Sequence, residues 1–186
     1  MEGIRRKAAG AAAAALLAAC MLSGCADAVK EGTKALENGE YGEAQKLFEE
    51  AVKDGDAETA ADAYRGLGMA YYEQEDYSSA LDAFQSALDK GGKQTVQIYN
   101  LMGICAMKNS EYGSALGYIQ AGLALAETAS AADADAGMLR EMRYNEIVCY
   151  EQTADWENAK QKISEYLADY PGDEDAEKEA EFLETR

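Results

Sequence analysis

The chain has 186 residues, 48% of them hydrophobic, which is enough to bury the core of one domain. Its 35 acidic residues outnumber its 17 basic residues and give a net charge of −18, so we expect no binding to nucleic acid, which needs basic residues. Histidine is absent and proline occurs once. Without histidine, the chain lacks the commonest general base and the commonest zinc ligand. The scarcity of proline favours an all-α fold.

The first 24 residues have the form of a secretory signal peptide. Three basic residues, Arg5, Arg6 and Lys7, precede an uncharged apolar run over residues 8–21. That run is shorter than the roughly 20 apolar residues that a spanning helix needs, and an acidic segment follows it. We therefore predict a targeting segment. Because residues 1–24 hold three basic residues and one acidic residue, the remaining chain carries a net charge of −20.

The segment Leu22-Ser23-Gly24-Cys25 resembles the lipobox of bacterial lipoproteins. The resemblance implies that the Cys25 thiol receives a diacylglyceryl group and that cleavage before Cys25 removes residues 1–24, including Cys20. Acyl chains would then hold the protein on the extracytoplasmic face of the cell membrane, or in an outer membrane if the host has one. This covalent lipid is the only cofactor that we expect. The alternative is an ordinary secreted protein, for which Ala26-Asp27-Ala28 offers a signal peptidase I site.

The rest of the chain repeats one pattern of aromatic, alanine and large apolar residues. The four sets are Tyr41, Ala44, Phe48, Ala51; Tyr77, Ala80, Phe84, Ala87; Tyr112, Ala115, Ile119, Gly122; and Trp156, Ala159, Ile163, Tyr166. Their second members are 36, 35 and 44 residues apart. A period near 34 residues is typical of a helical solenoid.

A second pattern precedes two of these sets, with Tyr64, Leu67-Gly68 and Tyr71 in one copy and Tyr99, Met102-Gly103 and Ala106 in the next. Together the two patterns resemble the tetratricopeptide (TPR) repeat over residues 25–172. The resemblance implies an all-α, right-handed solenoid of about four helix-turn-helix repeats, followed by a C-terminal capping helix.

The expected repeats are read from the register of these patterns. They cover residues 25–58, 61–94, 96–129 and 140–172, with an insertion or loop over 130–139 and the capping helix over 173–186. The extra residues are expected either to lengthen a helix or to form a mobile loop. The first copy is degenerate because Glu31-Gly32 replaces the apolar-glycine pair, and its first helix is expected to fray. The fourth copy departs in the same place, at Glu146-Ile147.

The remaining candidates for chemistry give no site. Cys105 and Cys149 fall at equivalent positions of neighbouring repeats, about 10 Å apart, which is too far for a disulfide, so we expect buried free thiols. The segment from Asp133 to Gly137 lacks the carboxylates of a calcium loop. We expect no metal site, no catalytic residues and no enzymatic activity.

Function is expected on the concave face, which in TPR domains is lined by the first helix of each repeat and receives peptides or helices. The positions carried over from the family are Arg65, Met69, Tyr72, Asn100, Ile104, Met107, Tyr144, Val148 and Glu151. The candidate residues are these positions without Glu151 and with Asn145, the neighbour of Tyr144, nine in all. Asparagine and arginine suit a bound backbone, whereas methionine, isoleucine and tyrosine accept apolar side chains. The alternative is that the protein's own cap or next repeat covers these residues.

The expected function is therefore that of a membrane-anchored scaffold that binds a protein or peptide in the cell envelope. Two other roles stay open, an assembly factor for outer-membrane or pilus machinery and an accessory subunit of a transporter.

Overall fold

The computed structural model describes residues 24–128 and 135–186, and every regular element in these ranges is a helix. The all-α fold is thereby confirmed. The expected signal peptide, apart from Gly24, and residues 130–134 of the expected insertion lie outside the described residues. None of the described helices is long and apolar enough to cross a membrane. The chain divides into two compact units, Met1–Lys93 and Gln94–Arg186, which are considered separately.

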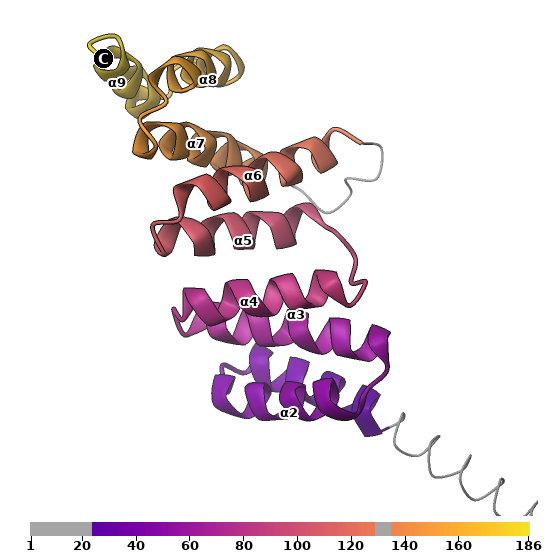
Figure 1. The fold of residues 1–186 in the computed structure, drawn as a ribbon. Coiled ribbons are helices and arrows are strands. Elements are labelled where there is room, and N and C mark those ends of the chain that lie inside the picture. Colours follow the sequence, from indigo (N-terminus) through magenta and orange to yellow (C-terminus); the bar gives the residue numbers. More distant parts are fainter. Residues whose placement is uncertain (1–23, 129–134) are drawn as a thin grey trace, which may run out of the picture. The chain divides into compact units, whose positions relative to one another are not determined.

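Unit 1 contains two helix pairs (Figure 1). A helix over residues 24–37 is followed by α2 (Tyr41–Asp54), and α3 (Ala57–Glu73) is followed by α4 (Tyr77–Asp89). The turn inside each pair has a residue with positive φ, Gly39 at 76° and Glu75 at 60°. Glycine adopts this conformation without steric cost.

Two glycines of α3 let aromatic rings approach its backbone closely. A Cβ atom on Gly66 would lie 2.3 Å from the ring of Phe48, and one on Gly68 would lie 2.5 Å from the ring of Phe84. Both phenylalanines are fully buried, as are the alanines around them. The large-small alternation in the sequence therefore produces close packing between helices.

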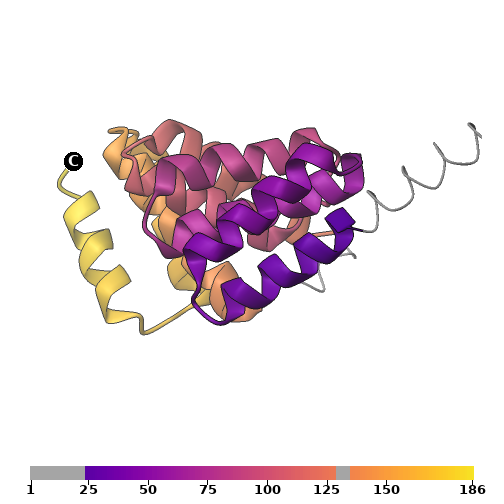
Figure 2. The same ribbon diagram turned by 90° about the horizontal axis from the view of Figure 1, so that it is seen from below.

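Unit 2 contains two further pairs and a terminal helix. These are α5 (Val96–Lys108) with α6 (Tyr112–Ala126), α7 (Ala136–Gln152) with α8 (Trp156–Asp169), and α9 (Glu174–Leu183). Figure 2 shows α9 in yellow at the C-terminal end of this unit. Its buried Ala176 and Leu183 join Ile147 and Ile163 in one core cluster. The helix α9 thus covers the apolar face of the last pair, as a cap does in repeat proteins.

Two helices begin earlier than the repeat register suggests, because an aspartate caps each of them. The helix α7 starts at Ala136, where Asp135 Oδ1 accepts from the backbone N–H of Met138 at 2.8 Å. Residues 136–139, expected in the insertion, therefore lengthen α7 by about one turn. The helix α3 starts at Ala57, behind a similar cap formed by Asp56.

The degenerate first copy also forms its first helix, contrary to the expected fraying. Glu31 is exposed, so its charge meets solvent and not the core. Gly32 faces the ring of Phe48, and a Cβ atom there would lie 2.9 Å from it. The glycine of the expected pair thus keeps its packing role although its apolar neighbour is missing.

Cys105 and Cys149 are buried free thiols, as the repeat spacing indicates. Burial raises the pKa of each thiol to about 11, and Glu146 adds to the shift of Cys149. Thiolate is therefore scarce at neutral pH, so both behave as small apolar residues.

Candidate binding surfaces

The nine residues expected to line the concave face all lie on the first helix of a pair. Arg65, Met69 and Tyr72 lie on α3, Asn100, Ile104 and Met107 on α5, and Tyr144, Asn145 and Val148 on α7. We call these three sets the first-helix faces. Within unit 2, α5 and α7 contact each other directly, which brings two of the sets onto neighbouring helices.

The face on α3 mixes one charged residue with two half-buried ones. Arg65 is exposed and forms an ion pair with Asp62 at 3.2 Å. Met69 and Tyr72 are half-buried. The ring of Tyr72 packs edge-on against Tyr77, with centroids 5.9 Å apart, so it is held in a fixed orientation.

The face on α5 contains an unsatisfied polar group. Asn100 is only 7% exposed, and its Oδ1 atom has no hydrogen-bond partner among the described residues. A buried acceptor without a donor costs about 1–3 kcal/mol. Ile104 and Met107 follow one and two turns later on the same side of α5 and are half-buried.

The face on α7 is partly engaged within the protein. The ring of Tyr144 packs edge-on against Tyr166 of α8, with centroids 5.6 Å apart, beside the core cluster that α9 closes. Burial, followed by the charge of Glu179, raises the pKa of Tyr144. Asn145 and Val148 are half-buried. At Tyr144 the contacts match the alternative that the protein's own C-terminal elements cover the face.

Two carboxyl groups meet where α7 approaches α9. The side chain of Glu179 lies near that of Glu151, whose Oε1 atom is buried without a partner among the described residues. Burial and the charge of Glu179 raise the pKa of Glu151 to about 7. A proton on Glu151 removes the repulsion between the two groups and the cost of burying its charge.

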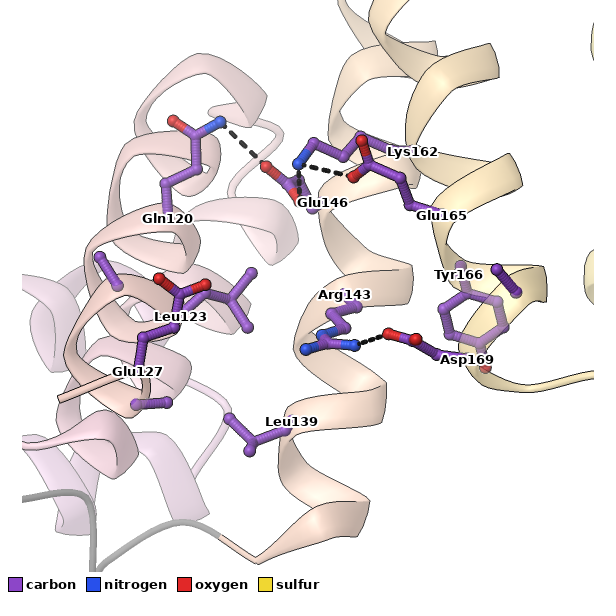
Figure 3. Close-up of a pocket in the computed structure, with 13 residues that line it drawn as sticks. Gln120, Leu123, Glu127, Leu139, Arg143, Glu146, Lys162, Glu165, Tyr166 and Asp169 are labelled. Carbon is purple, nitrogen blue, oxygen red and sulfur yellow. Dashed lines mark hydrogen bonds and ion pairs between the residues drawn. The ribbon is translucent and has the colours of Figure 1, made fainter. Parts of the chain in front are cut away.

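A pocket of about 720 Å³ lies elsewhere in unit 2, between α6, α7 and α8 (Figure 3). Its lining residues are Gln120, Leu123, Ala124 and Ala126 of α6, Glu127 directly after α6, Leu139, Arg143 and Glu146 of α7, and Lys162, Glu165, Tyr166, Ala168 and Asp169 of α8. None of the nine residues expected from the sequence lines it. We call it the α6–α8 pocket.

A chain of polar contacts crosses one end of the α6–α8 pocket. Gln120 Nε2 donates to Glu146 Oε1 at 3.0 Å, and Lys162 Nζ lies 3.5 Å from the other oxygen of Glu146. Lys162 also pairs with Glu165 at 3.2 Å. Figure 3 shows the groups converging from three helices. Glu146 is 5% exposed, so its charge depends on these partners.

A second polar cluster, which shares Tyr166 with the pocket, holds the start of α9. Arg140 donates to Asp173 at 2.6 Å and to the hydroxyl of Tyr166 at 2.9 Å, and that hydroxyl donates to Asp173 at 2.7 Å. Asp173 also caps α9 by accepting from the N–H of Ala176. The hydrogen bond from Arg140, followed by that from Tyr166, lowers the pKa of Asp173 to about 2.

One feature of the sequence is related to the α6–α8 pocket. Glu146-Ile147 stands where the second and third copies have an apolar residue followed by glycine. The sequence pattern alone identifies this pair only as a departure from the repeat. The structure shows Glu146 buried beside the pocket and Ile147 in the core. In the described part of the chain, no three cysteine or acidic residues form a group that could hold a metal ion.

Comparison with known proteins identifies the repeat. The model of the tetratricopeptide repeat family matches residues 29–95 and 68–134, which together span more than half of the chain. No curated protein matches the sequence.

Among solved structures, the chain is similar to YrrB, which is described as a TPR protein with an unusual peptide-binding site. The TM-score is 0.69, and the two sequences are 23% identical over 84% of this chain and 74% of that one. MamA from AMB-1 gives a TM-score of 0.66 and 14% identity over 86% and 80% of the two chains. BtubC from P. vanneervenii gives a TM-score of 0.56 and 14% identity over 81% of this chain and 72% of that one. These likenesses support the fold.

Proposed function

Because the chain belongs to the tetratricopeptide repeat family, we propose that it is a lipid-anchored scaffold of the bacterial cell envelope that binds a peptide or helix of another protein. TPR proteins generally act as protein-interaction scaffolds, and YrrB, which shares the fold, has a peptide-binding site. The binding residues are those of the first-helix faces.

The observation that supports peptide binding most directly is the first-helix face of α5, where Ile104 and Met107 lie on one side and are half-buried. Asn100 precedes them on that side, but its unpaired Oδ1 atom is enclosed by the protein and does not face a bound peptide directly. The exposed guanidinium of Arg65 on the α3 face can donate to peptide carbonyl groups.

Apolar contacts supply the rest of the binding energy. Ile104 and Met107 are half-buried on the same side of α5 as Asn100 and keep part of their surface free of the core. Methionine adapts its shape to different side chains because it is unbranched and polarisable. The α5 face therefore suits a peptide whose apolar side chains meet Ile104 and Met107.

Cys25 is the proposed point of lipid attachment, on the strength of its lipobox. In the structure Cys25 lies in the first described turn of the first helix and is 5% exposed. Burial, followed by the charges of Asp54 and Glu50, raises the pKa of its thiol. Such a thiol reacts slowly once the first pair has packed, so lipid transfer is expected on the precursor before it folds.

Charge substitution on the first-helix faces tests the binding role. We expect Ile104→Glu, alone or with Met69→Glu, to abolish capture of the partner from envelope extracts, while the helical circular dichroism signal is kept. Gln97→Glu adds the same charge at an exposed position of α5 and should leave capture unchanged. Unaltered capture by the Ile104→Glu protein contradicts the proposal. The identity of the captured protein then distinguishes envelope assembly from transport.

Palmitate labelling tests the anchor. We expect labelled fatty acid to be incorporated into the unmodified chain and lost in Cys25→Ser. The matched control is Cys20→Ser, because Cys20 is expected to leave with the signal peptide and its loss should not reduce labelling. Labelling that persists in Cys25→Ser contradicts attachment at this residue.

A further inference from the structure

Glu146 is a buried acid at a position where packing alone calls for an apolar residue. The second and third copies bury Leu67 and Met102 at the same place in the repeat. Burying a carboxylate costs free energy that an apolar side chain of similar size avoids. The acid in the fourth copy therefore points to a role for its charge, and that charge borders the α6–α8 pocket.

The α6–α8 pocket has an excess of negative charge. Glu127, Glu146, Glu165 and Asp169 line it together with only two cations. Both cations already have partners: Arg143 pairs with Asp169, and Lys162 with Glu146 and Glu165. The carboxylate of Glu127 has no such partner among the described residues. An anion would meet repulsion here, whereas a cation would be attracted.

Apolar surface lies beside these acids. Leu123 stands one turn before Glu127 on α6, and Leu139 stands one turn before Arg143 on α7. In Figure 3 the two leucines extend into the opening between α6 and α7. An aliphatic stem that ends in a positive charge matches this combination, because its methylene groups can cover the leucines while its head reaches a carboxylate.

We propose that the α6–α8 pocket is a second binding site, which takes a lysine or arginine side chain from a basic segment of a partner protein. Its volume of about 720 Å³ is within the range of ligand-binding pockets. The net charge of −18 on the whole chain attracts a basic partner over a longer distance, and the pocket supplies the specific contact.

The α6–α8 pocket is distinct from the first-helix face of α7. Leu139, Arg143 and Glu146 line the pocket, whereas Tyr144 and Val148 belong to the face. At about 100° per residue, the two sets are centred about 150° apart around the helix. A partner can therefore occupy one without covering the other, so the second site does not depend on the function proposed above.

Calorimetric titration of the purified full-length chain tests this site. The probe is the capped peptide Ac-Gly-Leu-Lys-Arg-Leu-Gly-NH2, compared with a neutral peptide in which glutamine replaces lysine and arginine. The pocket variant is Glu127→Gln with Glu165→Gln, both at exposed positions. The matched control is Glu157→Gln with Glu181→Gln, which removes the same charge from exposed positions of unit 2 that do not line the pocket.

We expect the basic peptide to bind and the neutral one not to bind. The pocket variant should bind the basic peptide about tenfold more weakly, because each lost charge pair contributes modestly to the binding free energy. The control variant should change the affinity less than about twofold. If both variants lost the same affinity for the basic peptide, binding would reflect only the general attraction of an acidic chain, and the proposal would be overturned. Equally tight, pocket-dependent binding of spermidine would also overturn it, in favour of a free polyamine.

Discussion

At the scale of single residues, small and charged side chains at a few positions decide how the helices meet. The repeat pattern predicted the glycine and phenylalanine positions, because their spacing is fixed by the helical period. It also placed Asn100 on a first-helix face. The burial of Asn100 and its unpaired Oδ1 atom could not be predicted, because both depend on side chains from other parts of the chain.

The close approach at Gly68 gives a prediction for stability. In Gly68→Ala the new Cβ would lie 2.5 Å from the buried ring of Phe84, so we expect the free energy of unfolding to fall by about 1–3 kcal/mol. Gly113→Ala is the control, because no atom lies within 4 Å of a Cβ there and alanine favours the helix by about 1 kcal/mol. Urea denaturation measures both. A Gly68→Ala protein as stable as the Gly113→Ala protein would contradict the packing described.

The carboxyl pair of Glu151 and Glu179 predicts a dependence of stability on pH. The pKa of Glu151 is about 7 in the folded state, above its ordinary value, so the folded state holds its proton more tightly. Its contribution is fully present below the ordinary pKa and is lost as the pH rises through about 7. With no histidine in the chain, few other groups titrate in this window.

We therefore expect the melting temperature to fall between pH 5.5 and pH 8, and Glu151→Gln to flatten this fall. After allowance for solvent screening, the variant should melt about 3 °C above the unmodified chain at pH 8. Glu157→Gln, at an exposed position of α8, should keep the full dependence. Parallel melting curves for Glu151→Gln and the unmodified chain across this range would contradict the raised pKa of Glu151.

At the scale of elements, the sequence predicted pairs of helices well and their ends less well. The repeat register marks family positions and not helix ends, whereas Asp56 and Asp135 set the starts of α3 and α7 by capping. The longer α7 is one of the two outcomes expected for the extra residues before the fourth copy. The α6–α8 pocket was missed for a different reason. It arises from the spacing between packed helices, which the repeat pattern does not encode, and Glu146 stood out only as a mismatch.

The terminal helix α9 gives a prediction at this scale. Asp173 caps α9 and binds Arg140 and Tyr166, so Asp173→Asn should weaken the attachment of α9 and speed hydrogen exchange of its amides several-fold. Because the folded pKa of Asp173 is lowered to about 2, the same stabilisation should be present above the ordinary aspartate pKa near 4 and be lost as the pH falls towards 2.

Asp175→Asn serves as the control for this variant. Asp175 lies in the first turn of α9, and within residues 24–128 and 135–186 its ion pair is with the exposed Lys178, at 3.1 Å. We expect its removal to leave exchange in α9 nearly unchanged, because exposed pairs of this kind contribute little. Equal exchange rates in the two variants would show that the cluster around Asp173 does not hold the helix.

At the scale of the whole molecule, the chain combines helical repeats with a strongly acidic surface. Unit 1 has its own core around Phe48, and unit 2 has its own around Ile163. The family and the all-α fold were predictable because they rest on periodicity. The binding surfaces were predictable in part, since the first-helix positions follow from the family, while the acidic pocket follows from residues peculiar to this chain.

The central claim is that the first-helix faces bind another protein, and photo-crosslinking in living cells tests it most directly. A benzophenone amino acid at Met107, half-buried on α5, should form an adduct with one partner protein. The same group at Ser114, exposed on α6 and outside the first-helix faces, should form none. No adduct from position 107, or the same adducts from both positions, would contradict the account.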